Sequence, residues 1–265
     1  MNAEYLRQIQ AAEKEGNARG AAFLKAQREA HKVAVEAGIV KDIPPVTSKV
    51  EKDSEPASPL RQQLQEYKSQ PHTPELVTAT WQTVWQSWGE RVDLKLPVPS
   101  LDRTPEELVE LEKNGNMLVF VPDRLASQEG RHLLGEIFPE MRSYSVEKGN
   151  PVTNEHNRGG WYDIEKSLDV PHTNTTEKEA KKIFDKQERN GQRLNTYIIG
   201  SQFSKLTAGH YFDESTYSRM PGSRREGRVV GALFNPSGDL SVRPYWDPRF
   251  RGRSLGARSE GVKKA

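Results

Sequence analysis

Residues 227–261 read GRVVGALFNPSGDLSVRPYWDPRFRGRSLGARSEG, and this stretch decides which fold we expect. Alternation of apolar and polar positions predicts two short strands, Val229–Phe234 and Asp239–Arg243. The residues between them, Asn235–Gly238, place proline and glycine where a tight turn needs them. The stretch therefore predicts a β-hairpin that buries one face and exposes the other.

The second predicted strand has a clear inside and outside. Leu240 and Val242 should face the core, while Ser241 and Arg243 point outward. A slip of one residue would bury the arginine and expose both apolar side chains, so the register should be fixed. Pro244 ends the strand, because proline has no N–H to donate to a sheet.

The residues after the hairpin form an irregular loop rich in arginine and aromatic side chains. Leu255–Arg258 then predicts a last short strand that closes the domain. Aromatic and arginine side chains give large contact area for little lost freedom, which is typical of binding surfaces. Burial of Trp246 and Phe250 under the loop is the alternative. The candidate ligand-contacting residues are Leu233, Asn235, Ser241, Arg243, Tyr245, Trp246, Asp247, Arg249, Phe250 and Arg251.

The composition of the whole chain points to a partly packed protein. Apolar residues make up 34% of 265 residues, and the mean hydropathy is −0.82. No apolar run approaches the length of a membrane span, and the first residues, MNAEYLRQIQ, lack the apolar segment of a signal peptide. We therefore expect a cytoplasmic protein without a membrane span. The sequence leaves the oligomeric state open.

Proline and tryptophan mark three regions. Residues 1–37 have a helix-forming composition with a thin alanine-rich stripe, so we expect a helical extension that packs weakly. Residues 38–74 contain six prolines among charges and serines, which predicts a linker with one short helix at Leu60–Tyr67. All five tryptophans lie beyond residue 74, so we expect an α+β domain over 75–265.

Several elements of that domain have local signals. Trp81, Trp85 and Trp88 share one helical face, which is either an exposed aromatic platform or the face that packs on the core. One helix should begin after the N-cap Thr104, and another, Glu177–Glu188, after Thr175 and Thr176. Further predicted elements are a helix or turn at Gly130–Phe138 and strands at Met117–Val121, Trp161–Ile164 and Leu194–Gly200.

Motifs of enzymes and metal sites are absent from the sequence. No two of the six histidines lie three or four residues apart, and cysteine is absent, so no metal site and no cofactor are expected. There is no phosphate-binding glycine loop, and Ser201 lacks the flanking glycines of a nucleophile elbow. An enzyme of unknown type is therefore a weaker hypothesis than a protein-binding module or a nucleic-acid-binding protein.

Three segments resemble a known fold. GQRLNTYIIGSQ (191–202), YSRMPGSR (217–224) and RSLGARSEG (253–261) are similar to the C-type-lectin-like fold, in the branch of formylglycine-generating-type domains and of the variable proteins of diversity-generating retroelements. The resemblance covers about residues 160–265, although Tyr217 replaces the family's usual tryptophan. The stretch from about residue 75 also resembles uncharacterised proteins of candidate-phylum bacteria.

The resemblance implies a binding protein. The enzymes of this fold use cysteines that bind copper, or a three-histidine iron site with an HxxxH pair, and this chain has neither. In the variable proteins, mutation of template adenines produces many residue types, but never Lys, Gln, Glu, Met or Trp. Residues 227–259 contain no Lys, Gln, Glu or Met, whereas the other 232 residues contain 61 of them. The alternative is that strands and turns disfavour these residues and that packed loops prefer arginine.

The leading hypothesis is thus a non-catalytic module that binds a protein ligand through a diversified C-terminal surface. The alternative is a nucleic-acid-binding protein, because residues 217–265 carry a net charge of +7 and the rest of the chain −5. Arginines interleaved with aromatic residues could hold phosphates and stack bases. No recognised nucleic-acid motif supports that reading.

Overall fold

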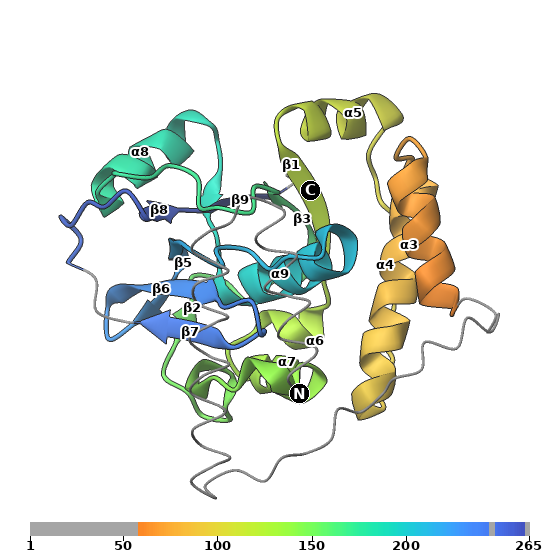
Figure 1. Ribbon diagram of the computed structural model, residues 1–265, viewed down its shortest axis with the longest axis horizontal. Helices are drawn as coiled ribbons and strands as arrows, with labels where there is room; N and C mark the ends of the chain where they lie inside the picture. The colour runs from red at the N-terminus through yellow and green to blue at the C-terminus, as the bar shows by residue number, and fades with distance from the viewer. Residues whose placement is uncertain (1–57, 244–246, 263–265) are drawn as a thin grey trace, which may run out of the picture. The chain divides into compact units, whose positions relative to one another are not determined.

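The computed structural model describes residues 58–243 and 247–262, which belong to one compact unit that begins at Pro56. This unit is α+β, as expected, with helices around two small sheets (Figure 1). The predicted helical extension at 1–37 lies outside the described residues. The helices are α3 (Pro59–Ser69), α4 (Pro74–Gly89), α5 (Pro105–Lys113), α6 (Asp123–Ala126), α7 (Arg131–Ile137), α8 (Glu177–Lys186) and α9 (Leu194–Ala208), with single 3-10 turns at Glu90–Val92, Pro139–Met141 and Tyr144–Val146.

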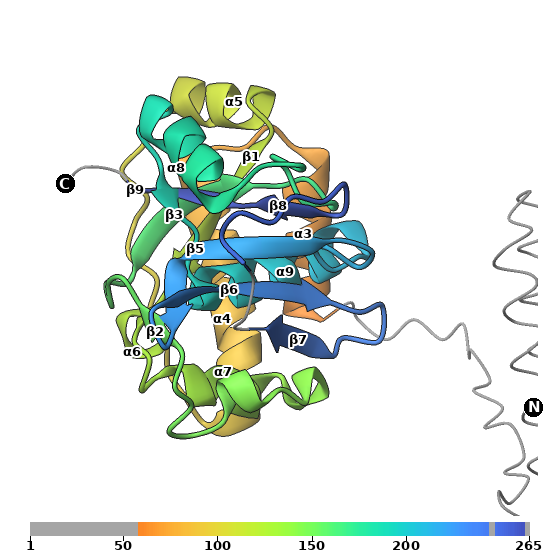
Figure 2. The ribbon, with the colours of Figure 1, turned by 90° about the vertical axis from the view of Figure 1, so that its left-hand side faces the viewer.

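The unit contains two sheets, one of four strands and one of five. The first has the order β1 (Asn116–Val121), β3 (Gly160–Glu165), β9 (Ser259–Val262), β4 (Asn190–Gly191), and all of its pairs are antiparallel. The second has the order β2 (Thr153–Asn154), β5 (Tyr217–Arg225), β6 (Arg228–Phe234), β7 (Leu240–Arg243), with β8 (Leu255–Ala257) parallel to β5. Figure 2 shows β5, β6 and β7 side by side, with β8 on the other side of β5.

The predicted hairpin is confirmed. β6 and β7 pair antiparallel, with Ala232 opposite Val242 and Leu233 opposite Ser241. Leu240 and Val242 are buried, Ser241 is half-buried and Arg243 is exposed, so the register is the expected one. The outer face is less open than predicted, because Val229 is also buried.

The tryptophan face of α4 belongs to the core, which confirms the packing alternative and makes the exposed platform wrong. Trp81, Trp85 and Trp88 are almost fully buried. The indole N–H groups of the first two donate to backbone carbonyls of β1, at 3.2 Å for Trp81 and 3.0 Å for Trp85. These bonds fix α4 against β1, since a buried indole needs an acceptor.

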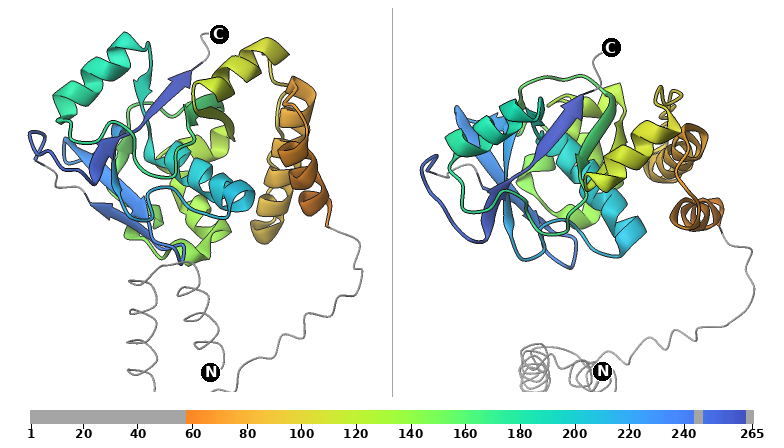
Figure 3. Two further views of the ribbon diagram at one scale, coloured as in Figure 1. Left: turned by 45° about the horizontal axis from the view of Figure 1, so that its top comes forward. Right: turned by 90° about the horizontal axis from the view of Figure 1, so that it is seen from above.

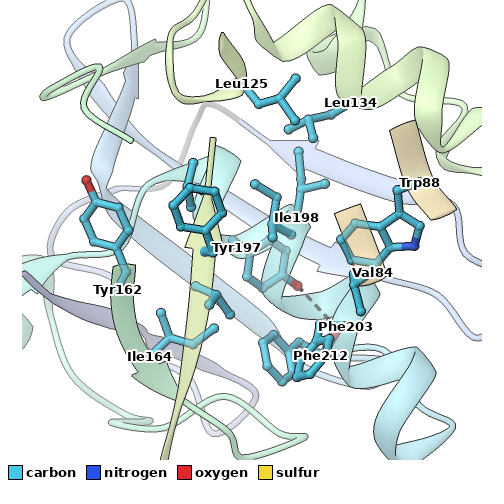
Figure 4. Packing of buried hydrophobic residues seen from close by; sticks show 14 of the residues in the cluster. Val84, Trp88, Leu125, Leu134, Tyr162, Ile164, Tyr197, Ile198, Phe203 and Phe212 are labelled. Carbon is cyan, nitrogen blue, oxygen red and sulfur yellow. Dashed lines mark hydrogen bonds between the residues drawn. The ribbon is translucent and has the colours of Figure 1, made fainter. Parts of the chain in front are cut away.

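The segment Leu194–Gly200 is helical, so the predicted strand is wrong. It forms the first half of α9, which lies between the second sheet and helices α3 and α4 (Figures 1 and 3). Every residue from Leu194 to Ser204 is buried. Figure 4 shows Tyr197, Ile198 and Phe203 of α9 among core side chains from other elements. A helix buried on all sides has no apolar stripe, so the helical period is invisible in its sequence.

Most of the other local predictions are confirmed. Capping boxes at Thr104 and Thr176 start α5 and α8, and the strands β1 and β3 lie where they were expected. The short helix predicted at Leu60–Tyr67 is α3, but it is not linker. Leu64 and Tyr67 are buried in the main core, so the folded unit begins near residue 58 rather than near 75.

The C-terminal segment forms the expected closing strand β8 and then a further strand, β9. Arg258, between them, turns inward and forms a fully buried ion pair with Asp213, Nη2 to Oδ1 2.8 Å. A second buried pair joins Arg193 to Glu260 of β9 at 2.6 Å. Loss of either partner would leave an uncompensated buried charge, so both pairs fix where the chain end lies. Among the described residues, no helix is long and apolar enough to cross a membrane.

Candidate functional site

The loop between β7 and β8 carries the exposed side chains that the sequence singled out. Its described part, residues 247–254, lies at the end of the unit that also carries α8 (Figure 1). Asp247, Arg249, Phe250 and Arg251 are all exposed. The side chain of Arg249 is 89% exposed and Phe250 is 50% exposed, so the alternative of burial under the loop does not hold for Phe250. Tyr245 and Trp246 lie outside the described residues.

The backbone of this loop is held by alternate carbonyl groups. The carbonyl oxygens of Pro248, Phe250, Gly252 and Ser254 each accept a hydrogen bond from the body of the unit. The donors are Glu177 N (3.0 Å), Arg219 Nη2 (2.6 Å), Asn174 N (3.0 Å) and Tyr217 N (2.8 Å) respectively. Each bond is made to the main chain of the loop, so none of them depends on which side chain a loop residue carries.

Arg219 is the buried centre of this anchoring. It projects from β5 and is 1% exposed. Its Nη2 donates to the carbonyl of Phe250, and its Nη1 donates to the carbonyl of Thr175 at 2.8 Å, just before α8. Burial lowers the pKa of Arg219 from its ordinary value, and the two carbonyl groups partly replace its lost hydration. A single side chain thereby joins the loop, β5 and the start of α8.

One exposed ion pair adds a side-chain contact between the loop and α8. Arg251 Nη2 lies 2.6 Å from Glu179 Oε1, and the two side chains are 50% and 41% exposed. Exposed pairs of this kind contribute about 0–1 kcal/mol. This contact is therefore minor beside the four backbone bonds.

The outer edge of the hairpin adjoins the loop through Tyr217. The Tyr217 hydroxyl lies 3.3 Å from Ser241 Oγ, and the Arg243 guanidinium lies 5.3 Å from the centre of its ring. Leu233 is half-buried opposite Ser241. Tyr217, whose backbone N–H donates to the Ser254 carbonyl of the loop, was not among the predicted contacts.

Asn235 has a structural role in the hairpin turn. Its side-chain oxygen accepts from the Asp239 N–H at 2.9 Å, and its amide donates to the Asp239 carboxylate at 2.8 Å. Hydrogen bonds from Asn235, Ser237 and Arg142 lower the pKa of Asp239 to about 2. The side chain of Asn235 is thus largely committed within the turn.

The residues that anchor the loop backbone were not predicted from the sequence. Arg219 and Asn174 look like ordinary polar residues, and their partners lie dozens of positions away. The only signal that could have found Arg219 is its position. Arg219 and its neighbour Met220 point to opposite faces of β5, and both are buried. Both faces of this strand are therefore covered.

A polar cleft of about 790 Å³ lies between α5, β3 and the end of α8. Its most buried acid is Glu165, which accepts from the Ser259 backbone N–H at 3.0 Å and lies 3.7 Å from His172. Burial alone would raise the pKa of Glu165, but hydrogen bonds from His172 and Ser259 and nearby arginines hold it below the ordinary value. Glu165 is therefore a committed acceptor rather than a proton donor poised near neutral pH.

Within the described ranges, no group of three or more His, Asp or Glu side chains could hold a metal ion. No protein-family model, curated protein or solved structure matches the chain.

Proposed function

We propose that this chain is a non-catalytic binding module that presents the loop after β7 to a protein ligand. The observation that carries the proposal is the anchoring of four alternate loop carbonyls while the neighbouring side chains remain exposed. A loop held in this way should depend little on which side chains it carries, although the Asp247 carboxylate also accepts from the Arg249 backbone N–H at 2.9 Å. Recognition chemistry can then change without loss of the fold, as in other scaffolds that carry binding loops.

The resemblance to C-type-lectin-like variable proteins supports the same proposal. The last short strand expected at Leu255–Arg258 corresponds to β8, and the loop lies within the stretch that lacks Lys, Gln, Glu and Met. We infer that the fold is of this type and that the loop is diversified through adenine mutation. Trp246 is not reachable by such mutation and must then be encoded outside the mutated codons. A reverse transcriptase gene and a near-copy of the loop's DNA beside this gene, differing at adenines, would test the diversification.

A binding screen tests the function itself. The full chain is immobilised and exposed to a panel of purified surface proteins from host and neighbouring cells. Arg249→Ala and Phe250→Ala should weaken binding to at least one panel protein by about tenfold or more, as expected for central arginine and aromatic contacts. Val109→Ala shortens an apolar side chain on α5 that is more exposed than Phe250, 61% against 50%, and should leave binding unchanged.

Two results would overturn the proposal. One is a panel in which no protein binds, or in which Val109→Ala weakens binding as much as the loop variants. The other is tight binding to nucleic acid: a generic single-stranded oligonucleotide should bind only in the non-specific range of about 10⁻⁴–10⁻⁶ M at physiological salt. Nanomolar affinity for it would favour a nucleic-acid-binding function instead.

A further inference from the structure

A groove of about 590 Å³ lies beside the loop, between α8 and the β5–β6 turn. Its volume is in the range of natural ligand pockets, about 300–1,000 Å³. The groove adjoins the proposed contact surface, because Pro248 and Arg249 of the loop line one side of it. Its other lining residues come from the start of α8 and from the β5–β6 turn: Thr176, Glu177, Lys178, Lys181, Arg224, Gly227, Arg228 and Val229.

The charge of this groove is strongly one-sided. Five lysines and arginines line it, against the single acid Glu177. Glu177 lies 3.4 Å from Arg224 and partly neutralises that guanidinium. Arg249 has its own partner, Asp247, at 3.3 Å. Across residues 58–243 and 247–262, by contrast, neither Lys178 nor Lys181 has an ion-pair partner, and both are exposed.

The floor of the groove is apolar rather than aromatic. Val229 is 4% exposed, and Pro248 and Gly227 add uncharged surface around it. Among the described residues that line the groove, none is aromatic. Single-stranded nucleic acids gain much of their affinity from bases stacked on aromatic rings. The lining therefore fits a carboxylate-bearing peptide with an apolar side chain better than it fits an oligonucleotide.

We propose that this groove binds an acidic, extended segment of the protein ligand, through the two lysines of α8 on one side and the arginines of the β5–β6 turn, Arg224 and Arg228, on the other. This inference rests on the proposed function, because it names the chemistry of the partner that the loop contacts. The loop side chains would supply variable contacts, and the groove would supply a constant preference for acidic segments. Complementary charge of this kind mainly speeds association and sets specificity.

The test uses the full chain and three labelled probes in fluorescence anisotropy. The probes are the peptide Glu-Glu-Leu-Glu-Glu, its neutral counterpart Gln-Gln-Leu-Gln-Gln, and a thymidine oligonucleotide of matching charge. Lys181→Glu is compared with Lys186→Glu, which makes the same charge change on the same helix, also at an exposed position, outside the groove. The acidic peptide should bind more tightly than both other probes. Lys181→Glu should weaken its binding by about tenfold and Lys186→Glu by less than about twofold.

The inference is overturned if the neutral peptide binds equally well, or if both lysine variants have the same effect. Tighter binding of the oligonucleotide, sensitive to Lys181→Glu, would replace the acidic peptide with nucleic acid as the occupant. The experiments distinguish failure of this inference from failure of the proposed function. If no acidic peptide binds but the loop variants still weaken a panel protein, the groove inference fails and the binding module stands. If neither binds, both fail.

Discussion

Val242 is the position where a single charge should unfold this unit, while the same charge one residue earlier should not. Val242 is 5% exposed and lies opposite Ala232 within the main core. Ser241 points to the other side of β7, is half-buried, and lies beside Tyr217. Replacing each residue in turn with aspartate therefore compares one added carboxylate on the two faces of one strand.

The expected cost at Val242 is large on two counts. The variant loses the burial of a valine side chain, about 1.5–3 kcal/mol. It also places a carboxylate without a cationic partner in the core, which costs several kcal/mol even after relaxation. The total is comparable with the whole stability of a typical domain, about 5–15 kcal/mol. Ser241→Asp keeps its charge at the surface and should cost less than about 1 kcal/mol.

Urea unfolding followed by tryptophan fluorescence measures both variants. Trp81, Trp85 and Trp88 are buried in the same core as Val242, so their emission reports its loss. Val242→Asp should be unfolded, or nearly so, in buffer, and Ser241→Asp should unfold at a urea concentration close to that of the parent. Equal effects of the two substitutions would refute the assignment of inner and outer faces, and with it the placement of the loop surface.

The fold makes three other predictions, for chain length, loop anchoring and pH. A chain that starts at residue 58 should melt like the full chain, whereas one that starts at residue 71 should melt lower in scanning fluorimetry, because it loses the two core side chains of α3. Arg219→Met should cost about 2–4 kcal/mol and speed hydrogen exchange in the loop, while the exposed Arg253→Met should change neither. Burial and neighbouring guanidinium groups lower the pKa of His156 from 6.5 to about 4. As the pH falls, His156 is protonated in the unfolded chain before it is protonated in the folded one. The free energy of unfolding should therefore decrease from pH 6.5 to 4, and His156→Gln should make this decrease smaller in urea titrations.

Local chemistry explains which elements could be predicted from the sequence. The starts of α5 and α8 depend on a threonine cap and a glutamate three residues later, all within one turn. The hairpin depends on alternation and on a five-residue turn stabilised by Asn235. In such places the residues that form the structure are also neighbours in the sequence, so pattern and outcome agree.

Long-range packing explains where prediction failed. LNTYIIG has the β-branched and aromatic composition of a strand, and its helical conformation is set by the elements that surround α9 on every side. α3 looked like linker because its two core contacts, Leu64 and Tyr67, are spread among polar residues. Tertiary burial overrode the local preference of α9, and it made the correctly predicted helix α3 part of the core.

The candidate site shows the same division. The outward direction of Ser241 and Arg243 follows from alternation, and the irregular loop follows from Pro244, so both could be predicted. The anchors could not, because Arg219 and Phe250 are 31 residues apart and Arg219 and Thr175 are 44 apart. A backbone carbonyl has no signature in the sequence. The feature that supports a display function therefore became visible only in the structure.

The shape of the loop should depend mainly on the hydrogen bonds to its backbone and little on its exposed side chains. The most direct test replaces Asp247, Arg249, Phe250 and Arg251 together with serine and measures the free energy of unfolding in urea. All four side chains are exposed, so we expect a loss of at most about 2 kcal/mol, or about 0.5 kcal/mol for each position. A loss as large as that of Val242→Asp would contradict it, because the loop would then be part of the core.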